Sequence, residues 1–313
     1  MRARVFLKDE AGSVSILVAA MLVVLLGFAA LAVDIGLATA EKRSVVTAAD
    51  AAALAGAQEL VFNPSAGPVK AIEYAVQKNG ADADKVTAVV SEGNKAITVQ
   101  AGKEVNYGFA RVLGFESVTV SAQAKAIVGS IVGMRGVVPL AAPETDYQQG
   151  SLYELKLGQW KQGELGPGNF NAIAPGKPGA SDFRTYMQQG YPGMIRFGDV
   201  IDTESGNMSG PTKDGVEYRI DLCRQNCNPG GCTWDNHSIH CPLLVYVPLY
   251  APPDSLNKVK EVTIAGFAAF FLENETGNGS SSTVKGRFLR SVAFGEINPD
   301  LNGHGLYGVK LVE

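Results

Sequence analysis

Four cysteines between residues 223 and 241 are the richest group of chemically active side chains in this 313-residue sequence. They are Cys223, Cys227, Cys232 and Cys241, spaced C-x3-C-x4-C-x8-C, with two histidines between the last two. Thiolates and imidazoles are preferred zinc ligands, and two cysteine pairs can also form two disulfides. The paired C-x2-C knuckles of common zinc sites are missing. The choice between these interpretations therefore depends on the compartment in which the cysteines lie.

The rest of the sequence offers few groups for catalysis. It has three histidines, no G-x-S-x-G nucleophile motif and no H-E-x-x-H metalloprotease motif. Residues 303–308 match G-x-G-x-x-G, but too few residues follow them to form a phosphate-binding helix. Asp199, Asp202 and Glu204 lack EF-hand spacing, so a solvated loop explains them better. We therefore predict a non-enzymatic protein with no catalytic residue, no cofactor and no metal.

Composition excludes two further classes. With 46% hydrophobic residues the chain is too apolar to be disordered, and its length suits about two domains. The 27 basic and 31 acidic residues give a net charge of -4, and no basic stripe is present. Nucleic acid is therefore not an expected partner.

Residues Val14 to Val33 form an apolar run in which Ser15 is the one polar side chain and no charge occurs. As a helix this run spans about 30 Å, the thickness of the hydrocarbon layer of a bilayer. A buried helix of a soluble protein would show a polar stripe, which this run lacks. We therefore expect a membrane-spanning helix.

Two kinds of processing compete with a permanent span. Ala38-Thr39-Ala40 is similar to a signal cleavage site, but the apolar core of a signal is usually about 7–15 residues long, shorter than this run. The basic stretch ending at Gly12 is similar to a prepilin leader, which would be cut between Gly12 and Ser13. Pilins usually carry Glu five residues after the cut, where this sequence has Leu17. Cleavage between Gly12 and Ser13 stays open.

The distribution of basic residues predicts the orientation. Arg2, Arg4 and Lys8 precede the span, whereas Lys42 and Arg43 follow it. This small bias, with a short N-terminal arm, favours the N-terminus in the cytoplasm and the remaining chain outside. An oxidising exterior in turn favours two disulfides for the four cysteines over a metal site or free thiols, with three connectivities open.

The helical pattern continues beyond the membrane. Glu41 to Leu60 is rich in Ala and contains no Pro, so one helix is expected from Val14 to about Phe62. Its small residues permit close backbone approach on several faces. Packing on the neighbouring part of the chain is the favoured interpretation, and homo-oligomerisation through this helix is the alternative.

This N-terminal pattern carries a family resemblance. The apolar run ends Ala-Leu-Ala-Val-Asp-Ile-Gly (residues 30–36), Ala-Glu-Lys-Arg follows, and Ala-Ala-Asp-Ala-Ala-Ala-Leu-Ala-Gly-Ala-Gln-Glu-Leu comes next (residues 48–60). Together these segments resemble the N-terminal module of TadE/TadG-like Flp pilus-assembly proteins, over about residues 11–60. The Asp-x-Ser-x-Ser metal signature of von Willebrand A domains, which some members carry, is absent. The resemblance implies a membrane component of pilus assembly.

Two acidic residues lie inside this block. Asp34 follows the span directly and marks its outer edge, where a carboxylate reaches water. Asp50 is a lone acid in an Ala-rich stretch. Both are candidates for assembly contacts with basic partners, and Asp50 could instead pair with a Lys or Arg of the following lobe or face solvent.

We expect an α+β protein of four parts. These are a cytoplasmic basic leader (1–12), the transmembrane and extended helix (13–62), a small α/β lobe (63–130) and a larger β-rich extracytoplasmic lobe (131–313), a sandwich or barrel. In the small lobe we predict helices at 68–79 and 105–112 and strands at 86–90, 96–99 and 117–128. In the large lobe we predict a helix at 181–189 and strands at 137–140, 152–157, 193–201, 216–222, 243–249, 258–272 and 284–297, the last two as a hairpin.

The resemblance and the predicted topology together suggest a function. We expect a single-pass protein of the bacterial cytoplasmic membrane that takes part in Flp/Tad-type pilus assembly and contacts pilins or other assembly proteins. The alternative is an envelope-anchored protein that binds a surface ligand as an adhesin.

Overall fold

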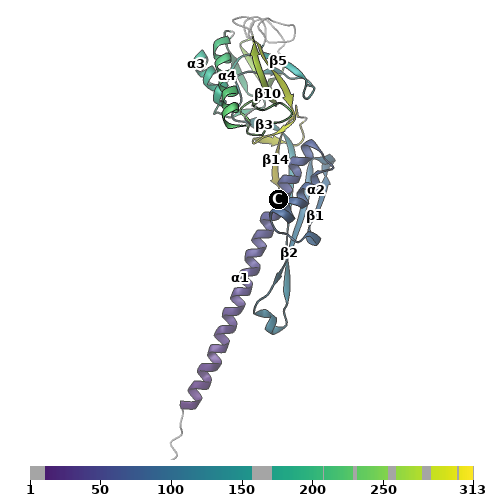
Figure 1. Ribbon diagram of the computed structural model, residues 1–313, viewed down its shortest axis with the longest axis vertical. Coiled ribbons are helices and arrows are strands. Elements are labelled where there is room, and N and C mark those ends of the chain that lie inside the picture. Colours follow the sequence, from purple (N-terminus) through teal and green to yellow (C-terminus); the bar gives the residue numbers. More distant parts are fainter. Residues whose placement is uncertain are drawn as a thin grey trace, which may run out of the picture.

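The computed structural model of the protein describes residues 11–156, 171–206, 208–227, 231–252, 259–276, 283–301 and 303–312. Within them a long N-terminal helix is followed by two mixed β-sheets with shorter helices, which confirms the predicted α+β class. Figure 1 shows an elongated molecule, with the helix at one end and a β-rich head at the other. The basic residues Arg2, Arg4 and Lys8, on which the predicted orientation depends, lie outside the described residues.

Helix α1 (Ala11–Phe62) is a single helix of 52 residues, about 78 Å long, as the sequence predicts. Its first part leaves its apolar side chains uncovered, and Leu25 and Phe28 are 68% and 67% exposed. The most apolar 18-residue window has a mean hydropathy of 3.0 and no buried residue. By length and composition α1 can therefore cross a membrane.

The second part of α1 has a buried face. Its buried residues recur at intervals of three or four, as on one side of a helix, and are Val45, Ala48, Ala49, Ala52, Ala53, Ala57, Leu60 and Val61. They pack against β2, β3 and helix α2 (Gly67–Glu73), which continues as a π-helical turn to Lys78. A Cβ added to Gly56 would lie 2.7 Å from Ile97 Cδ1 and 3.1 Å from the Gly67 carbonyl oxygen. The small residues of this face thus serve close packing within the chain.

The first sheet lies along α1, in the order β1-β2-β3-β14-β12, and β7 and β13 also pair with β3. Its strands are β1 (Thr87–Ser91), β2 (Ala96–Asn106), β3 (Ser117–Met134), β7 (Ile195–Arg196), β12 (Ser291–Val292), β13 (Glu296–Asn298) and β14 (Leu306–Val312). Strands β2 and β3 form a long antiparallel hairpin, from Asn106 opposite Ser117 to Ala96 opposite Ile127. Its tip reaches down beside α1 toward the apolar part of that helix (Figure 1).

The head is built around the second sheet, in the order β4-β9-β10-β11-β5, with β8 paired to β10 and β6 to β8. Its strands are β4 (Ala142–Pro143), β5 (Leu152–Lys156), β6 (Ile173–Ala174), β8 (Val200–Thr203), β9 (Leu244–Tyr250), β10 (Glu261–Thr276) and β11 (Thr283–Leu289). The central strand β10 supplies Phe267, Phe270 and Phe271 to the core, where Phe288 of β11 meets Phe270 edge to face. Buried aromatic side chains and edge-to-face pairs of this kind stabilise a core.

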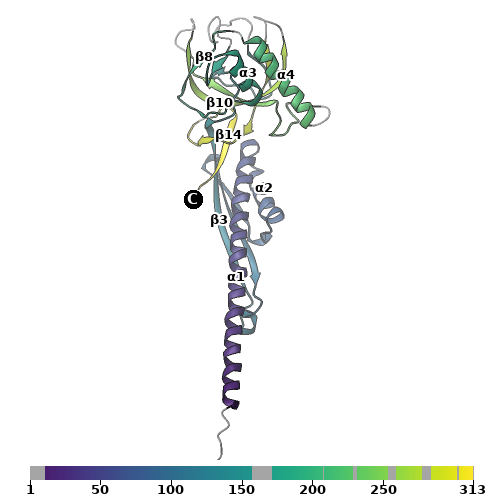
Figure 2. The same ribbon diagram turned by 90° about the vertical axis from the view of Figure 1, so that its left-hand side faces the viewer.

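The chain enters the head through one strand of the first sheet and returns through the neighbouring strand. Strand β3 runs up from the first sheet into the head, and β14, near the end of the chain, pairs antiparallel with residues 125–130 of β3. Figure 2 shows β14 returning from the head to the side of α1. Most of the chain between β3 and β14, apart from the short strands β7, β12 and β13, therefore forms the head as an insertion into the first sheet. The paired strands β3 and β14 fix the head to the helix.

Several predicted elements are confirmed in type. The predicted helices 68–79 and 181–189 appear as α2 with its π-helical turn and as α3 (Ala180–Gln189). The predicted strands of the small lobe appear as β1, β2 and β3, and the hairpin of 258–272 with 284–297 appears as β10 and β11. Its closing turn, 277–282, lies outside the described residues.

Three predictions of local structure are wrong. Residues 216–222, predicted as a strand, belong to helix α4 (Ser209–Asn226). The predicted helix 105–112 is replaced by the end of β2 and a 3-10 turn at Ala110–Leu113. Residues 137–140 form isolated bridges and no strand. Of the two alternatives expected for the large lobe, a sandwich or a barrel, the barrel is not formed, because neither sheet closes among the described residues.

Candidate functional site

The four cysteines lie where helix α4 ends and strand β9 begins. Cys223 is in the last turn of α4, and Cys227, four residues on, is its C-cap. Residues four apart in a helix share a face, so both thiols point to the same side. Cys232 follows in the loop, and Cys241 lies in the turn before β9, where its carbonyl accepts the Leu244 N–H at 3.0 Å. Residues 228–230 of the loop are outside the described residues.

The structure brings all four sulfurs into one cluster. Their Sγ atoms lie within 4.8 Å of one another, and those of Cys223 and Cys241 are 3.7 Å apart. A disulfide bond is about 2.05 Å long, and the structure holds all four as free cysteines. The two disulfides therefore stay a prediction. Cys223 and Cys241 are buried, and Cys227 and Cys232 are half-buried at the rim.

Burial keeps two of the four thiols, Cys227 and Cys241, protonated. Burial first, and then hydrogen bonds with Cys232 and Cys223, raise the pKa of the Cys227 thiol to about 11. Burial raises the pKa of Cys241 as well. The thiols of Cys227 and Cys241 are therefore uncharged at neutral pH.

A buried arginine holds the chain beside the cluster. The Arg219 side chain of α4 donates to the carbonyls of Met187, at 2.6 Å, and Pro242, at 2.8 Å. Burial lowers the pKa of Arg219 to about 10. The arginine thus connects α4 to α3 and to the turn that carries Cys241. Sequence patterning missed it, because a buried arginine with carbonyl partners leaves no signal in the apolar pattern.

The cluster opens onto a surface hollow of about 430 Å³ lined by Leu222, Asn226, Cys227, Cys232, Ser238, His240 and Pro242. His240 is exposed there, whereas the other histidine of the segment, His237, has its Nδ1 3.2 Å from the Thr233 carbonyl and its ring against Phe271. The close group of potential metal ligands therefore consists of the four thiols.

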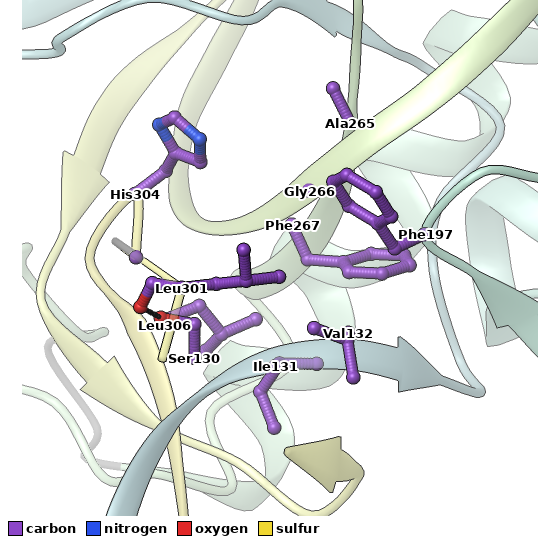
Figure 3. A pocket seen from close by; sticks show the side chains of 11 residues that line it. Ser130, Ile131, Val132, Phe197, Ala265, Gly266, Phe267, Leu301, His304 and Leu306 are labelled. Carbon is purple, nitrogen blue, oxygen red and sulfur yellow. Dashed lines mark hydrogen bonds between the residues drawn. The ribbon is translucent and has the colours of Figure 1, made fainter. Parts of the chain in front are cut away.

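A second pocket, at the junction of head and helix, is very small. Figure 3 shows Ile131 and Val132 of β3 below Phe197 and Phe267, with Leu301 to the left of Phe267. The Ser130 hydroxyl donates to the Leu301 carbonyl at 2.8 Å. The volume of about 10 Å³ holds one water molecule at most. This junction is packed core rather than a ligand site.

Asp34 is buried although it lies next to the apolar part of α1. Its carboxylate accepts three backbone N–H groups at the tip of the β2–β3 hairpin, from Gly108 at 2.8 Å, Phe109 at 3.0 Å and Ala110 at 2.6 Å. Only 2% of Asp34 is exposed. The residue that the sequence marks as the edge of the span thus joins the helix to the hairpin, and its described partners are backbone amides rather than a basic side chain.

The structure describes no side-chain contact that supports a role for the other predicted site residues. Asp50 is half-buried on α1, and no hydrogen bond or ion pair joins it to a lysine or arginine among the described residues. Gly12 and Ser13 fall in the first turn of α1, and the Ser13 side chain is outside the described part. Their roles in assembly and in leader cleavage stay predictions.

Comparison with known proteins identifies the first segment. Residues 12–59 match the family model described as Putative Flp pilus-assembly TadE/G-like. The chain therefore carries a TadE/G-like Flp pilus-assembly domain, which coincides with nearly all of α1. No curated protein and no solved structure matches the chain.

Proposed function

We propose that this protein is a non-enzymatic, single-pass membrane component of Flp/Tad-type pilus assembly. The observation that carries the proposal is the coincidence of the TadE/G-like segment, residues 12–59, with a helix that is uncovered and apolar in its first part and packed in its second. The first part is the anchor and the second part supports the head.

The anchor follows from the cost of exposed apolar surface. Large side chains on all sides of α1 between Val14 and Val33 are more than 45% exposed. A soluble monomer rarely carries a contiguous apolar patch of this size, whereas a bilayer covers it. The sheet and head then project from one side of the membrane. The small excess of basic residues before the span favours the outside of the cytoplasm as that side.

The outer part supplies the surface for partners. The head is held at the far end of the helix by the paired strands β3 and β14. Pilins or other assembly proteins are the partners that the TadE/G-like domain suggests, and this projecting position suits contact with them.

Deletion of the gene in its native host tests the role. Loss of Flp-type pili, counted by electron microscopy, is expected, with recovery on expression of the full chain but not of a chain starting at residue 34. Crosslinking in membranes followed by purification should recover pilins or other assembly proteins. Normal piliation in the deletion strain would contradict the proposal and favour the adhesin alternative.

A fusion of alkaline phosphatase after the last residue tests the topology. The phosphatase should be active, because it folds outside the cytoplasm. An inactive but stable fusion protein would show that the outer lobes are cytoplasmic. A fusion after Lys8, before the span, is the matched control and should be inactive.

A further inference from the structure

We propose that Cys223, Cys227, Cys232 and Cys241 bind one structural Zn²⁺ ion. The family match ends at residue 59, and pilus assembly as proposed above does not require this site. The inference concerns the head alone and stands on the arrangement of its four sulfurs.

The distances suit one tetrahedral ion. Zinc–thiolate bonds are about 2.3 Å long, so the sulfurs of a tetrahedral site lie about 3.8 Å from one another. The Cys223 and Cys241 sulfurs are 3.7 Å apart, and all four lie within 4.8 Å of one another. Two disulfides would require only that each sulfur lie close to one other sulfur. Convergence of all four on one point is what a shared ion requires.

The supporting elements fit a cation. Cys223 and Cys227 present two sulfurs from the last turn of α4, where the helix dipole places partial negative charge. Cys232 and Cys241 approach from the loop and from the turn before β9. This division, two ligands from a helix end and two from the chain that follows, lets one ion fix both segments.

The site is closed, which indicates structural zinc. Four protein ligands complete a tetrahedron and leave no position for a water or substrate. Cys223 and Cys241 are 1% and 3% exposed, so an ion between them is shielded from solvent on that side. Soft thiolates select Zn²⁺ over the oxygen-preferring Mg²⁺ and Ca²⁺. The ion would join α4 to β9 across a segment whose described residues, 231–243, form no helix and no named strand.

Metal content and thiol reactivity of the full chain, purified in detergent from membranes, test the proposal. One zinc per chain is expected by elemental mass spectrometry. All four thiols should resist alkylation until the protein is denatured in the presence of a chelator. After exchange, Co²⁺ should give the intense visible and near-ultraviolet absorption of tetrahedral thiolate ligation. Intact mass showing two disulfides, or folded protein that binds neither metal, would overturn the proposal.

Variants assign the ligands. Cys232→Ser, at the half-buried rim, should leave a folded head with zinc content well below one per chain and no Co²⁺–thiolate absorption. Ser238 and His240 line the same hollow. The variants Ser238→Ala and His240→Ala should keep the full zinc content and the Co²⁺–thiolate absorption. Loss of metal in His240→Ala equal to that in Cys232→Ser would contradict the four-cysteine site. One zinc ion per chain retained in Cys232→Ser would also contradict the four-cysteine site.

Discussion

The Asp34 carboxylate accepts the backbone N–H of Ala110 at 2.6 Å, although the two residues are 76 positions apart in the sequence. The N–H groups of Gly108 and Phe109 meet the same carboxylate. Three donors on one charged acceptor form a strong, directional contact. It joins the tip of the β2–β3 hairpin to α1 immediately beyond the apolar run, and so fixes the level at which the first sheet begins.

Removal of this carboxylate should release the hairpin tip. In Asp34→Ala the amides of residues 108–110 lose their acceptor, so we expect their hydrogen exchange to accelerate by at least about tenfold, the ratio that corresponds to one lost hydrogen bond to a charged group. Hydrogen exchange with mass spectrometry of the full chain in detergent measures this change.

Asp50→Ala is the matched control, because it removes the other acid of the same helix, whose side chain has no described partner. Exchange at residues 108–110 should be unchanged there. Equal exchange at these amides in Asp34→Ala and the parent chain would show that the tip is held by other contacts.

The hairpin tip should lie at the membrane surface. Phe109, Val112 and Phe115 are 54%, 88% and 63% exposed on a tip that Asp34 holds at the end of the apolar run. Aromatic and apolar side chains at that level partition into the bilayer interface. We therefore expect Phe109→Trp, with Trp160 and Trp234 replaced by Phe, to be quenched by brominated lipids after reconstitution.

Val89→Trp in the same background is the control for lipid contact. Val89 is 61% exposed on β1, away from the hairpin tip, and its tryptophan should stay unquenched. Equal quenching at both positions would indicate non-specific lipid contact. No quenching at position 109 would place the tip clear of the bilayer, even where the span itself is confirmed.

Long periodic or uniformly apolar segments were predictable from sequence. Uniform apolarity and Ala content define α1, and alternation defines β3. Residues 216–222 were wrongly predicted as a strand because apolar and polar residues alternate there, as they do in a strand. The apolar residues are Val216, Tyr218, Ile220 and Leu222. In α4 the buried face instead includes Gly215, Arg219 and Cys223, whose helical spacing is invisible to a hydrophobic pattern.

Long-range contacts account for the other differences. Residues 105–112 have helix-like apolar spacing, yet β2 continues to Asn106 because β3 pairs with it to the end, and Asp34 then binds the turn. The return of β14 to β3 carries no local signal either. For the cysteines, spacing identified the group, but the convergence of the four sulfurs depends on how α4 meets β9.

The Ala-rich face of α1 should tolerate no larger side chain. Ala53 is fully buried against the first sheet and α2. Overpacking of a tight core costs about 1–3 kcal/mol, so Ala53→Leu should lower the melting temperature of the detergent-solubilised chain. Gln58→Leu, exposed on the same helix, should melt like the parent. An unchanged melting temperature with loss of self-association in Ala53→Leu would instead assign this face to homo-oligomerisation.

The junction of head and sheet should weaken in acid. The Arg196 guanidinium of β7 donates to both Glu296 carboxylate oxygens of β13, at 2.9 and 2.8 Å, and these hydrogen bonds lower the pKa of Glu296 below its ordinary 4.5. Because the folded-state pKa is lowered, the pair stabilises the fold above the ordinary value, and this contribution is lost as pH falls through the lowered one. Glu296→Gln should therefore melt below the parent at neutral pH, and the difference should vanish in acid. Glu116→Gln makes the same chemical change at an exposed position and should show no such difference. If the difference in melting temperature between Glu296→Gln and the parent stayed the same at low pH, the effect would come from packing rather than from the ion pair.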